Sequence, residues 1–578
     1  MSWESPSGHQ LAAYLYIPQN ATKDTPAPGV VTIEGWYNNK EMQDLYSIEL
    51  ARRGYVVLAL DLHSHGDSES LSIAELYDGA VGVDGAVQLI ASLPYVDTAR
   101  IGVTGHSSGG TAANMAVEID NSRETPLIAA VLQQAGDWQD DTGGDHSGDY
   151  GSRSVGIIAS THDDFYFGTY NDAGNMLTNP VAFMETDGAK KFLNFNEDGF
   201  AGIAEGGKYY TRDFDGKTAY RVIYRPNMIH PLVAFSTTCV GYAVDFFDTT
   251  LGAPKPLPAS DQIWPIKAVF NSLGVIGLLI FMVSFTLVLL DTPVFSALRS
   301  GEIVQPAPVQ DSGAKAWYWV LLVIGAVFSG SSFLFCMNTV YSKTTNFFVQ
   351  TGPLTIGTWA ALCGVFAIFC SAVFYGSYGK KHGWSARRAG LYLNLEQLWK
   401  TIALAVIVIV VSFGLVFAAH YFFQVDYRMY VVAFKTFGAD KVLIALRYLP
   451  FFLLFYVMNS ISANCFNYNT IGGKNGNILI FAFFNALGAI FVVASQYIYF
   501  YATGYQLYGL TEGQRIGPIW LFPCMVLLFV TPIMSRIIYK RTRNPYIAGL
   551  INAMFIVMIS CSNTTTILGG GELIATTF

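Results

Sequence analysis

Long apolar runs in the second part of the chain limit its fold more than any other feature of the sequence. A helix that crosses a bilayer needs about 20 mostly apolar residues. Eight runs of this kind lie at approximately 268–290, 317–340, 353–375, 401–423, 448–468, 477–501, 517–538 and 545–568. The fifth and eighth runs are more polar than the others. The sequence therefore predicts an all-α transmembrane domain of about eight helices in residues 264–578.

The charge of the chain changes at the same point. Residues 1–263 carry 15 Lys and Arg against 34 Asp and Glu, a net charge of −19, whereas residues 264–578 carry +11. The strongly acidic part argues against nucleic acid as a partner. A proline-punctuated stretch at 251–263 separates the two parts. We expect a domain at 1–250, an extended linker at 251–263 and the transmembrane domain at 264–578.

Basic residues between the apolar runs predict the orientation in the membrane. Lys380, Lys381, Arg387, Arg388 and Lys400 follow the third run, and Arg536, Lys540, Arg541 and Arg543 follow the seventh. Loops rich in Lys and Arg face the cytoplasm. We therefore expect an integral protein of a bacterial cell membrane with residues 1–263 and the C-terminus outside. Four basic residues after the fourth run oppose this assignment: Arg428, Lys435, Lys441 and Arg447.

An exported N-terminal domain requires a targeting signal. Residues 1–6, Met-Ser-Trp-Glu-Ser-Pro, do not resemble one. Either an N-terminal anchor helix is missing from this version of the chain, or the domain faces the cytoplasm. We favour the missing anchor.

Polar side chains gather inside two of the apolar runs. The fifth run contains Asn459, Ser460, Ser462, Asn464 and Asn467, and the eighth contains Asn552, Ser560, Ser562, Asn563 and Thr564 to Thr566. Such residues line a lipid or substrate path in some membrane proteins. In others they form hydrogen bonds between helices. We favour the second interpretation.

Residues 1–250 alternate between strand and helix patterns. Strands are expected at 11–17, 30–33, 55–60, 101–104, 128–133, 155–160 and 219–224, and helices at 41–53, within 73–92, at 108–119 and at 231–248. Alternation of this kind is typical of an α/β fold, in which helices flank a mostly parallel sheet on both faces.

The strand expected at 101–104 leads into the turn Gly105-His106-Ser107-Ser108-Gly109 and then into a helix. A serine between small residues at a strand-to-helix turn has the geometry of a nucleophile elbow. Only Ser107 has a glycine two residues away on each side. The N-terminus of the following helix would direct N–H groups toward an oxyanion formed at this serine. The alternative is an ordinary glycine-rich turn. Whether an acid and a base follow downstream in the expected order distinguishes the two interpretations.

A second motif follows the strand expected at 55–60. Asp61-Leu62-His63-Ser64-His65-Gly66-Asp67-Ser68 is similar to the Asp-x-x-Gly-His-Gly-x-Ser loop of α/β-hydrolases, with Ser64 where glycine is usual. The order of motifs over residues 8–248 resembles this family, most of all its dienelactone-hydrolase and acyl-esterase branches. The resemblance implies a serine hydrolase whose catalytic residues follow the chain order Ser, Asp, His.

On this resemblance, the catalytic acid follows a late strand and the catalytic base follows the last strand. Asp163 comes after the strand expected at 155–160, with Asp164 as the alternative acid. His230 comes after the strand expected at 219–224. The resemblance makes Ser107 the nucleophile, His230 the base and Asp163 the group that orients the imidazole. Surface loop acids and a helix-capping histidine are the alternative interpretation.

The resemblance also implies an oxyanion hole formed by the backbone N–H groups of Trp36 and Ser108. Glu34-Gly35-Trp36 stands where the family often has His-Gly-x. Because backbone groups are the donors, we expect Glu34 to alter the support of the loop and the choice of substrate more than the chemistry. Residues 171–215 exceed what one helix and one strand need, so we expect an insertion that forms either a lid over the acyl pocket or a surface excursion.

We therefore expect a membrane-tethered serine hydrolase that cleaves a carboxylic ester or related acyl substrate through an acyl-enzyme. Its partners would be an acyl or ester substrate, either a small molecule or a lipid, and the lipid bilayer. No residue spacing suggests a metal site, and we expect no cofactor. The alternatives are an acyltransferase or other lipid-modifying enzyme, a peptidase similar to prolyl oligopeptidases, and a transport or sensing protein with a non-catalytic hydrolase-like domain. An intact triad counts against the last of these.

Overall fold

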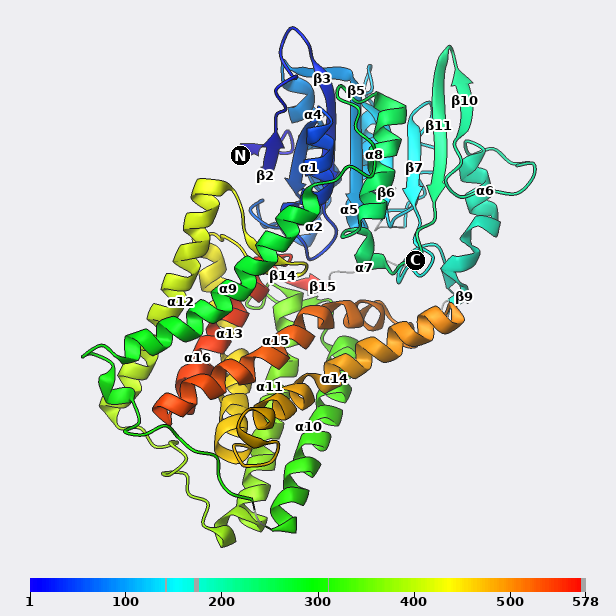
Figure 1. Ribbon diagram of the computed structural model, residues 1–578. Coiled ribbons are helices and arrows are strands. Elements are labelled where there is room, and N and C mark those ends of the chain that lie inside the picture. Colours follow the sequence, from blue (N-terminus) through cyan, green and yellow to red (C-terminus); the bar gives the residue numbers. More distant parts are fainter. Residues whose placement is uncertain (141–142, 171–175, 310, 573–578) are drawn as a thin grey trace.

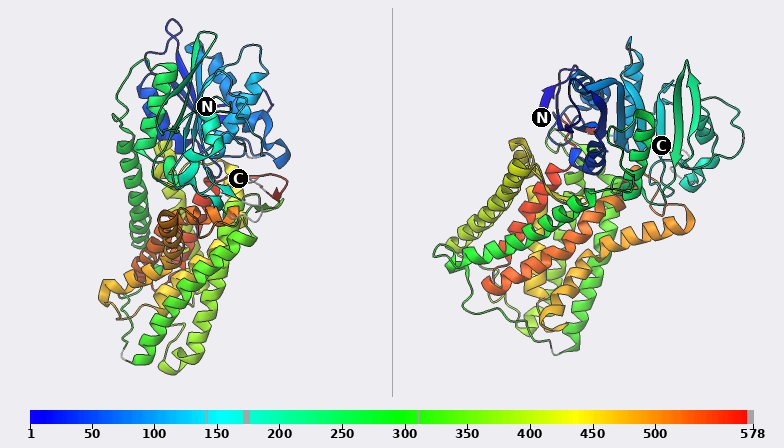
Figure 2. Two further views of the ribbon diagram at one scale, coloured as in Figure 1. Left: turned by 90° about the vertical axis from the view of Figure 1, so that its right-hand side faces the viewer. Right: turned by 45° about the horizontal axis from the view of Figure 1, so that its top comes forward.

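The computed structural model describes residues 1–140, 143–170, 176–309 and 311–572. Figure 1 shows a sheet flanked by helices at one end of the molecule and a bundle of long helices at the other. We call residues 1–250 the sheet half and residues 264–572 the helical half. The two views in Figure 2 show the sheet half seated on one end of the bundle.

The sheet half contains a nine-stranded sheet of order β1-β2-β4-β3-β5-β6-β7-β11-β10. Its strands are β1 (Ser2–Glu4), β2 (Gln10–Tyr16), β3 (Ala27–Ile33), β4 (Val56–Asp61), β5 (Val96–His106), β6 (Ile128–Gln134), β7 (Ser154–Ile158), β10 (Tyr210–Phe214) and β11 (Lys217–Tyr224). Neighbouring strands from β4 to β11 in this order pair in parallel. Only β1, β2 and β10, at the two edges, pair antiparallel. This arrangement confirms the predicted α/β-hydrolase fold.

Helices cover both faces of the sheet, and alternate residues of each strand therefore enter two different cores. On one face, α1 (Asp44–Arg52) and α8 (Thr237–Leu251) pack on side chains that include Val30. On the other face, α4 (Val83–Ser92) and α5 (Ser108–Asn121) pack on side chains that include Val31. Because both faces are covered, all six residues of β4 are buried.

Several elements of the sheet half differ from the sequence-based expectation. The helix expected within 73–92 is three short helices, α2 (Ile73–Leu76), α3 (Asp78–Val81) and α4, and Gly82 with a φ of 94° separates the last two. The helix expected at 231–248 is broken into α7 (His230–Val233) and α8, because Ser236 caps α8 through the N–H of Cys239. Strands β1 and β10 were not expected.

The helical half contains the eight predicted long apolar helices. Its helices are α9 (Trp264–Leu290), α10 (Ser312–Thr339), α11 (Thr351–Ser377), α12 (Leu395–Phe423), α13 (Ala439–Ile461), α14 (Gly473–Thr503), α15 (Glu512–Thr542) and α16 (Pro545–Ser562). In the described part of the chain, these eight helices are long and apolar enough to cross a membrane. Helix α16 ends at residue 562 and not at 568, because the polar residues that follow turn toward the sheet half.

Polar side chains inside the bundle connect the helices to one another. Asn459 of α13 donates to Asn485 of α14 at 2.6 Å. Ser460 of α13 lies 2.6 Å from the hydroxyl of Ser535 in α15. Asn464, in the turn that ends α13, accepts from buried Arg536 of α15 at 2.8 Å. These contacts correspond to the interhelical interpretation of the polar cluster in the fifth run.

Charged side chains join the two halves. Lys435, which follows the hairpin β13 (Tyr427–Met429) and β14 (Val432–Phe434), donates to Glu41 of the sheet half at 3.2 Å. Arg428 of the same hairpin donates to Asn39 at 3.0 Å. At the start of α9, the N–H groups of Ile263 and Trp264 donate to Glu49 at 2.6 and 3.0 Å. Two of the basic residues that follow the fourth apolar run, Arg428 and Lys435, thus form hydrogen bonds with the sheet half.

Replacing Lys435 by methionine should weaken the attachment of the two halves. Glu41 is 5% exposed, and without Lys435 it would keep the Tyr14 hydroxyl as a donor at 3.1 Å and the cations of Lys40 and Arg428 at 3.9 and 4.0 Å. Breaking a buried pair on one side costs about 3–5 kcal/mol, and we expect the low end of this range because these two cations remain. The apparent thermal midpoint of the detergent-solubilised protein should therefore fall by several degrees. Lys208→Met, which removes an exposed pair with Glu205, is the matched control and should change little. Equal shifts for the two variants would contradict the prediction.

Candidate active site

Ser107 occupies a sharp turn between β5 and α5. Its backbone has φ 56° and ψ −126°, a conformation that a non-glycine residue rarely adopts. Its N–H donates to the carbonyl of Gln134 on the neighbouring strand β6 at 2.8 Å, which anchors the turn to the sheet. Strain of this kind concentrates at functional sites, where the surrounding structure maintains it.

The glycines on either side of Ser107 are required by close backbone contacts. A Cβ on Gly105 would lie 2.2 Å from the carbonyl group of Gly109. A Cβ on Gly109 would lie 2.3 Å from the carbonyl oxygen of Glu34. The loop that begins at Glu34 therefore passes directly against the serine turn, and both glycines are needed for this approach.

His230 and Asp163 form a buried pair beside this turn. The Nδ1 atom of His230, at the start of α7, lies 2.9 and 3.0 Å from the two carboxylate oxygens of Asp163, which follows β7. Asp163 also accepts hydrogen bonds from Ser160 Oγ and from the N–H groups of Phe165 and Tyr166, at 2.9 to 3.0 Å. These donors fix the carboxylate. An Nδ1–H that donates to it leaves Nε2 of His230 as a proton acceptor.

Asp164 has a different contact with the same histidine. Its carboxylate accepts from the backbone N–H of His230 at 3.3 Å, not from the imidazole. Burial, followed by the nearby charge of Asp163, holds the pKa of Asp164 well above its usual range. Asp164 thus positions the backbone of His230, whereas Asp163 contacts its ring.

The loop that contains Trp36 is supported by Glu34. The Glu34 carboxyl accepts from the N–H of Leu62 at 2.8 Å, which ties this loop to the one after β4. Burial raises the pKa of Glu34 well above its usual range. The Trp36 ring lies 4.9 Å, centroid to centroid, from that of His65 in the same neighbouring loop. Trp36 and Ser108 both line the cavity that contains Ser107.

Aromatic rings enclose His230. Phe165 and Tyr166 lie 4.9 and 5.8 Å from it, and the ring of His106 lies 4.8 Å away, each measured between ring centroids. Burial lowers the pKa of His106 to about 3, so His106 is neutral beside the imidazole at physiological pH. His230 itself is 4% exposed.

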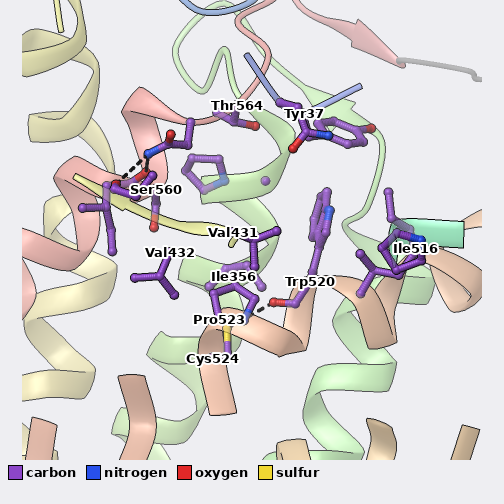
Figure 3. Close-up of a pocket in the computed structure, with 18 of the residues that line it drawn as sticks. Tyr37, Ile356, Val431, Val432, Ile516, Trp520, Pro523, Cys524, Ser560 and Thr564 are labelled. Atoms are coloured by element: carbon purple, nitrogen blue, oxygen red, sulfur yellow. Dashed lines mark hydrogen bonds between the residues drawn. The ribbon is translucent and has the colours of Figure 1, made fainter. Parts of the chain in front are cut away.

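Ser107 and His230 line a cavity of about 270 Å³ to which both halves of the molecule contribute residues. The sheet half contributes the serine turn, the Trp36 loop and residues near His230. The helical half contributes side chains of α11, α13, α15, α16 and the β13–β14 hairpin. Figure 3 shows Tyr37 at the top of this cavity, Trp520 of α15 in its middle and Cys524 at its bottom.

The cover over Ser107 comes from the helical half. Tyr430, at the tip of the β13–β14 hairpin, donates to the carbonyl of Pro231 at 2.7 Å, and it lines the cavity together with Val431 and Val432. The insertion expected at 171–215 lies partly outside the described residues. In its described part, 176–215, no residue lines this cavity, and Phe183 and Phe192 pack against Trp138. The described part of the insertion is therefore a surface excursion and not a lid.

Ser560, Asn563 and Thr564 of the eighth apolar run line the cavity, which is the interpretation that we did not favour for that run. The other helical residues of the site were not predicted. The apolar run at 517–538 contains Trp520, Pro523 and Cys524, and nothing in its composition marks these residues as lining an active site. Among the described residues, no group of three or more His, Cys, Asp or Glu side chains is arranged to hold a metal ion.

Comparisons with known proteins relate the sheet half to esterases. Residues 1–132 match a family model described as esterase FrsA-like. A curated relative, uncharacterized protein PA2218 of Pseudomonas aeruginosa, is 35% identical over 117 residues, which cover 20% of this chain and 31% of the relative. The chain thus spans less than a third of the length of the curated relative that it matches.

Three solved structures that are similar to part of the chain are the uncharacterized PA2218 and two esterases. The crystal structure of PA2218 has a TM-score of 0.21 at 29% identity and covers 23% of this chain and 41% of that one. Est1E of Butyrivibrio proteoclasticus, with ferulic acid bound, has a TM-score of 0.28 at 15% identity, covering 43% and 98%. The Pyrococcus furiosus esterase Pf2001 has a TM-score of 0.29 at 13% identity, covering 44% and 92%. The fold and the esterase family match together support a hydrolase of the α/β-hydrolase type.

Asp164→Asn should change how stability depends on pH. Because the folded-state pKa of Asp164 is raised, its contribution to stability is present below about pH 4 and is lost as the pH rises through the folded-state value. Each unit by which the pKa is raised corresponds to about 1.4 kcal/mol. The asparagine variant has no carboxyl to titrate, so its stability does not fall in this way as the pH rises. The difference in thermal midpoint, variant minus unaltered protein, should therefore increase between pH 4 and pH 8. Asp24→Asn, at an exposed position, is the control. A difference for Asp164→Asn that stays constant with pH would contradict the prediction.

Proposed function

We propose that the protein is a membrane-tethered serine hydrolase that cleaves a carboxylic ester or related acyl substrate. The observation that carries this proposal is the meeting of three features in one place: the strained Ser107, the His230–Asp163 pair and a cavity lined by Ser107 and His230. The substrate is an acyl or ester compound, and the lipid bilayer surrounds the helical half.

In the acylation step, Oγ of Ser107 attacks the carbonyl carbon while Nε2 of His230 takes the hydroxyl proton. Asp163 stabilises the resulting imidazolium through Nδ1. The backbone N–H groups of Trp36 and Ser108 bind the oxyanion, and the loss of one such donor costs roughly 100- to 1000-fold in rate. The carbon–oxygen bond to the leaving alcohol then breaks, and the alcohol departs with the proton held by His230.

In the deacylation step, water attacks the acyl-enzyme. His230 takes a proton from this water, the bond to Ser107 breaks, and the proton returns to the serine oxygen. The carboxylic acid is released and the enzyme is regenerated.

Acyl transfer is a second candidate, and the apolar wall that the helical half adds to the cavity favours it. Apolar side chains beside the serine leave less room for water next to an acyl-enzyme. An alcohol of a lipid acceptor in the cavity would then compete with water for the acyl group. Capture of the acyl group by added acceptor lipid distinguishes transfer from hydrolysis.

Labelling with a fluorophosphonate probe tests the nucleophile. Ser107→Ala should abolish both labelling and the turnover of a short p-nitrophenyl ester. Ser108→Ala is the matched control, since only the backbone N–H of Ser108 has a role, and it should keep both. Labelling that persists in Ser107→Ala would contradict the proposal.

Asparagine substitutions separate the two candidate acids. Asp163→Asn should lower kcat/KM by about 10⁴, because the imidazole then loses the partner that fixes its tautomer. Asp164→Asn should cost much less, since its carbonyl oxygen can still accept from the N–H of His230. A larger loss for Asp164→Asn than for Asp163→Asn would reverse the assignment.

We further propose that the sheet half lies outside a bacterial cell membrane. The segment that joins α11 to α12 lies at the end of the bundle away from the sheet half (Figure 1), as expected for a cytoplasmic surface. Its side chains Lys380, Lys381, Arg387 and Arg388 are exposed. Arg428 and Lys435, which opposed this orientation in the sequence, have partners at Asn39 and Glu41. A membrane-impermeant maleimide should label Asp24→Cys and spare Arg388→Cys in intact cells. The opposite pattern would place the sheet half in the cytoplasm.

A further inference from the structure

The active-site cavity extends deep into the helical half. On α11 its lining begins at Gly352, in the first turn, and reaches Cys363. At 1.5 Å per residue this is about 16 Å along the helix axis. The hydrocarbon core of a bilayer is about 30 Å thick, so the cavity reaches about half of that depth.

Polarity decreases along this cavity. The end near the sheet half has polar side chains, among them Asn39, Arg428 and Asn563. The part inside the bundle is lined by apolar side chains such as Ile356, Phe452, Leu527 and Ile556. A polar group placed there would lose its hydrogen bonds to water without replacement, whereas a hydrocarbon chain has no hydrogen bonds to lose.

The volume suits an extended chain. A cavity needs about 10–15 Å³ by the same measure to hold one water molecule. The observed 270 Å³ therefore accommodates on the order of twenty groups of that size. This exceeds what the acyl group of a short ester would fill.

A second cavity continues toward the opposite end of the bundle. It has a volume of about 130 Å³, lies among α10, α11, α13 and α14, and reaches Phe374 near the end of α11. The two cavities have Cys363 and Phe455 in their linings in common. These two side chains therefore stand where one cavity ends and the other begins.

We propose that the substrate is an ester with a long hydrocarbon chain, whose carbonyl lies at Ser107 and whose chain lies inside the helical half. Cys363 and Phe455 form the floor of this chain site and set the longest chain that fits. The helical half is thus part of the substrate site as well as an anchor. This inference rests on the proposed ester hydrolysis at Ser107.

A series of p-nitrophenyl esters with chains of increasing length tests the proposal on the full-length protein in detergent. The unaltered protein should show its highest kcat/KM with long chains. Cys363→Trp fills the floor, so it should lower kcat/KM at least tenfold for the longest chains and leave short chains unaffected. Phe455→Ala joins the two cavities and should shift the optimum to longer chains. Val365→Trp is the matched control on α11, because Val365 is 55% exposed on the outer surface of the bundle, and it should change nothing.

The results separate failure of this inference from failure of the proposed function. If no ester is turned over and no label depends on Ser107, the proposed function is wrong. If short esters are turned over in a Ser107-dependent way but the chain-length profiles of all variants coincide, only the chain site is wrong. If Cys363→Trp loses labelling at Ser107 as well, it is misfolded, and an unchanged profile for Phe455→Ala then overturns the inference.

The source of the chain is decided by a second arm. The protein is reconstituted in vesicles of a long-chain phospholipid, and release of fatty acid is measured beside turnover of a long-chain ester added from solution. Release that requires Ser107 identifies the bilayer as the source, and turnover of the added ester alone identifies a soluble substrate. Turnover of neither would overturn the proposal.

Discussion

Burial of the carboxyl edge of the sheet against the ends of the long apolar helices is the constraint on which the rest of the structure depends. Parallel strands place the residues that follow them at one edge, so Ser107, Asp163 and His230 all lie on this side. Because the edge is covered, polar groups there need partners within the protein. Glu41 pairs with Lys435, and the cavity at Ser107 has an apolar wall.

Covering the site changes its electrostatics. The ring of His230 is surrounded by Phe165, Tyr166 and neutral His106, and hydrogen bonds are stronger in such a medium than in water. The same medium makes an unpaired charge costly. Asp163 meets this condition with several donors, whereas the raised pKa of Asp164 indicates that it is protonated more readily than an exposed carboxyl. Two adjacent carboxyls thus have different environments because their hydrogen-bond partners differ.

The sequence predicted those features that depend on local pattern. The apolar runs predicted the eight helices. The glycines around Ser107 predicted a tight turn, and in the structure close backbone contacts leave no room for a Cβ at either glycine. The ends of elements were less accurate: the break before α8 depends on the cap by Ser236, which composition does not reveal. The pairing of Lys435 with Glu41 joins residues that are 394 positions apart, and no local pattern contains it. The wall of the cavity was not predictable for the same reason, since Trp520 lies in an ordinary apolar run. The roles of Trp36 and Ser108 remain predictions.

The segment after α16 has a consequence for the order in which the molecule is completed. Thr566 donates its N–H to Ser64 at 2.8 Å, and Thr565 lies 2.9 Å from Nε2 of His65, whose ring packs on Trp36. Thr565 and Thr566 follow the eight long apolar helices in the chain, whereas Trp36 precedes all of them. The sheet half therefore leaves the ribosome long before the contacts behind its Trp36 loop exist. Full support of that loop requires α16 and the segment after it to be in place, so the Trp36 loop acquires its native contacts only after the helical half has folded.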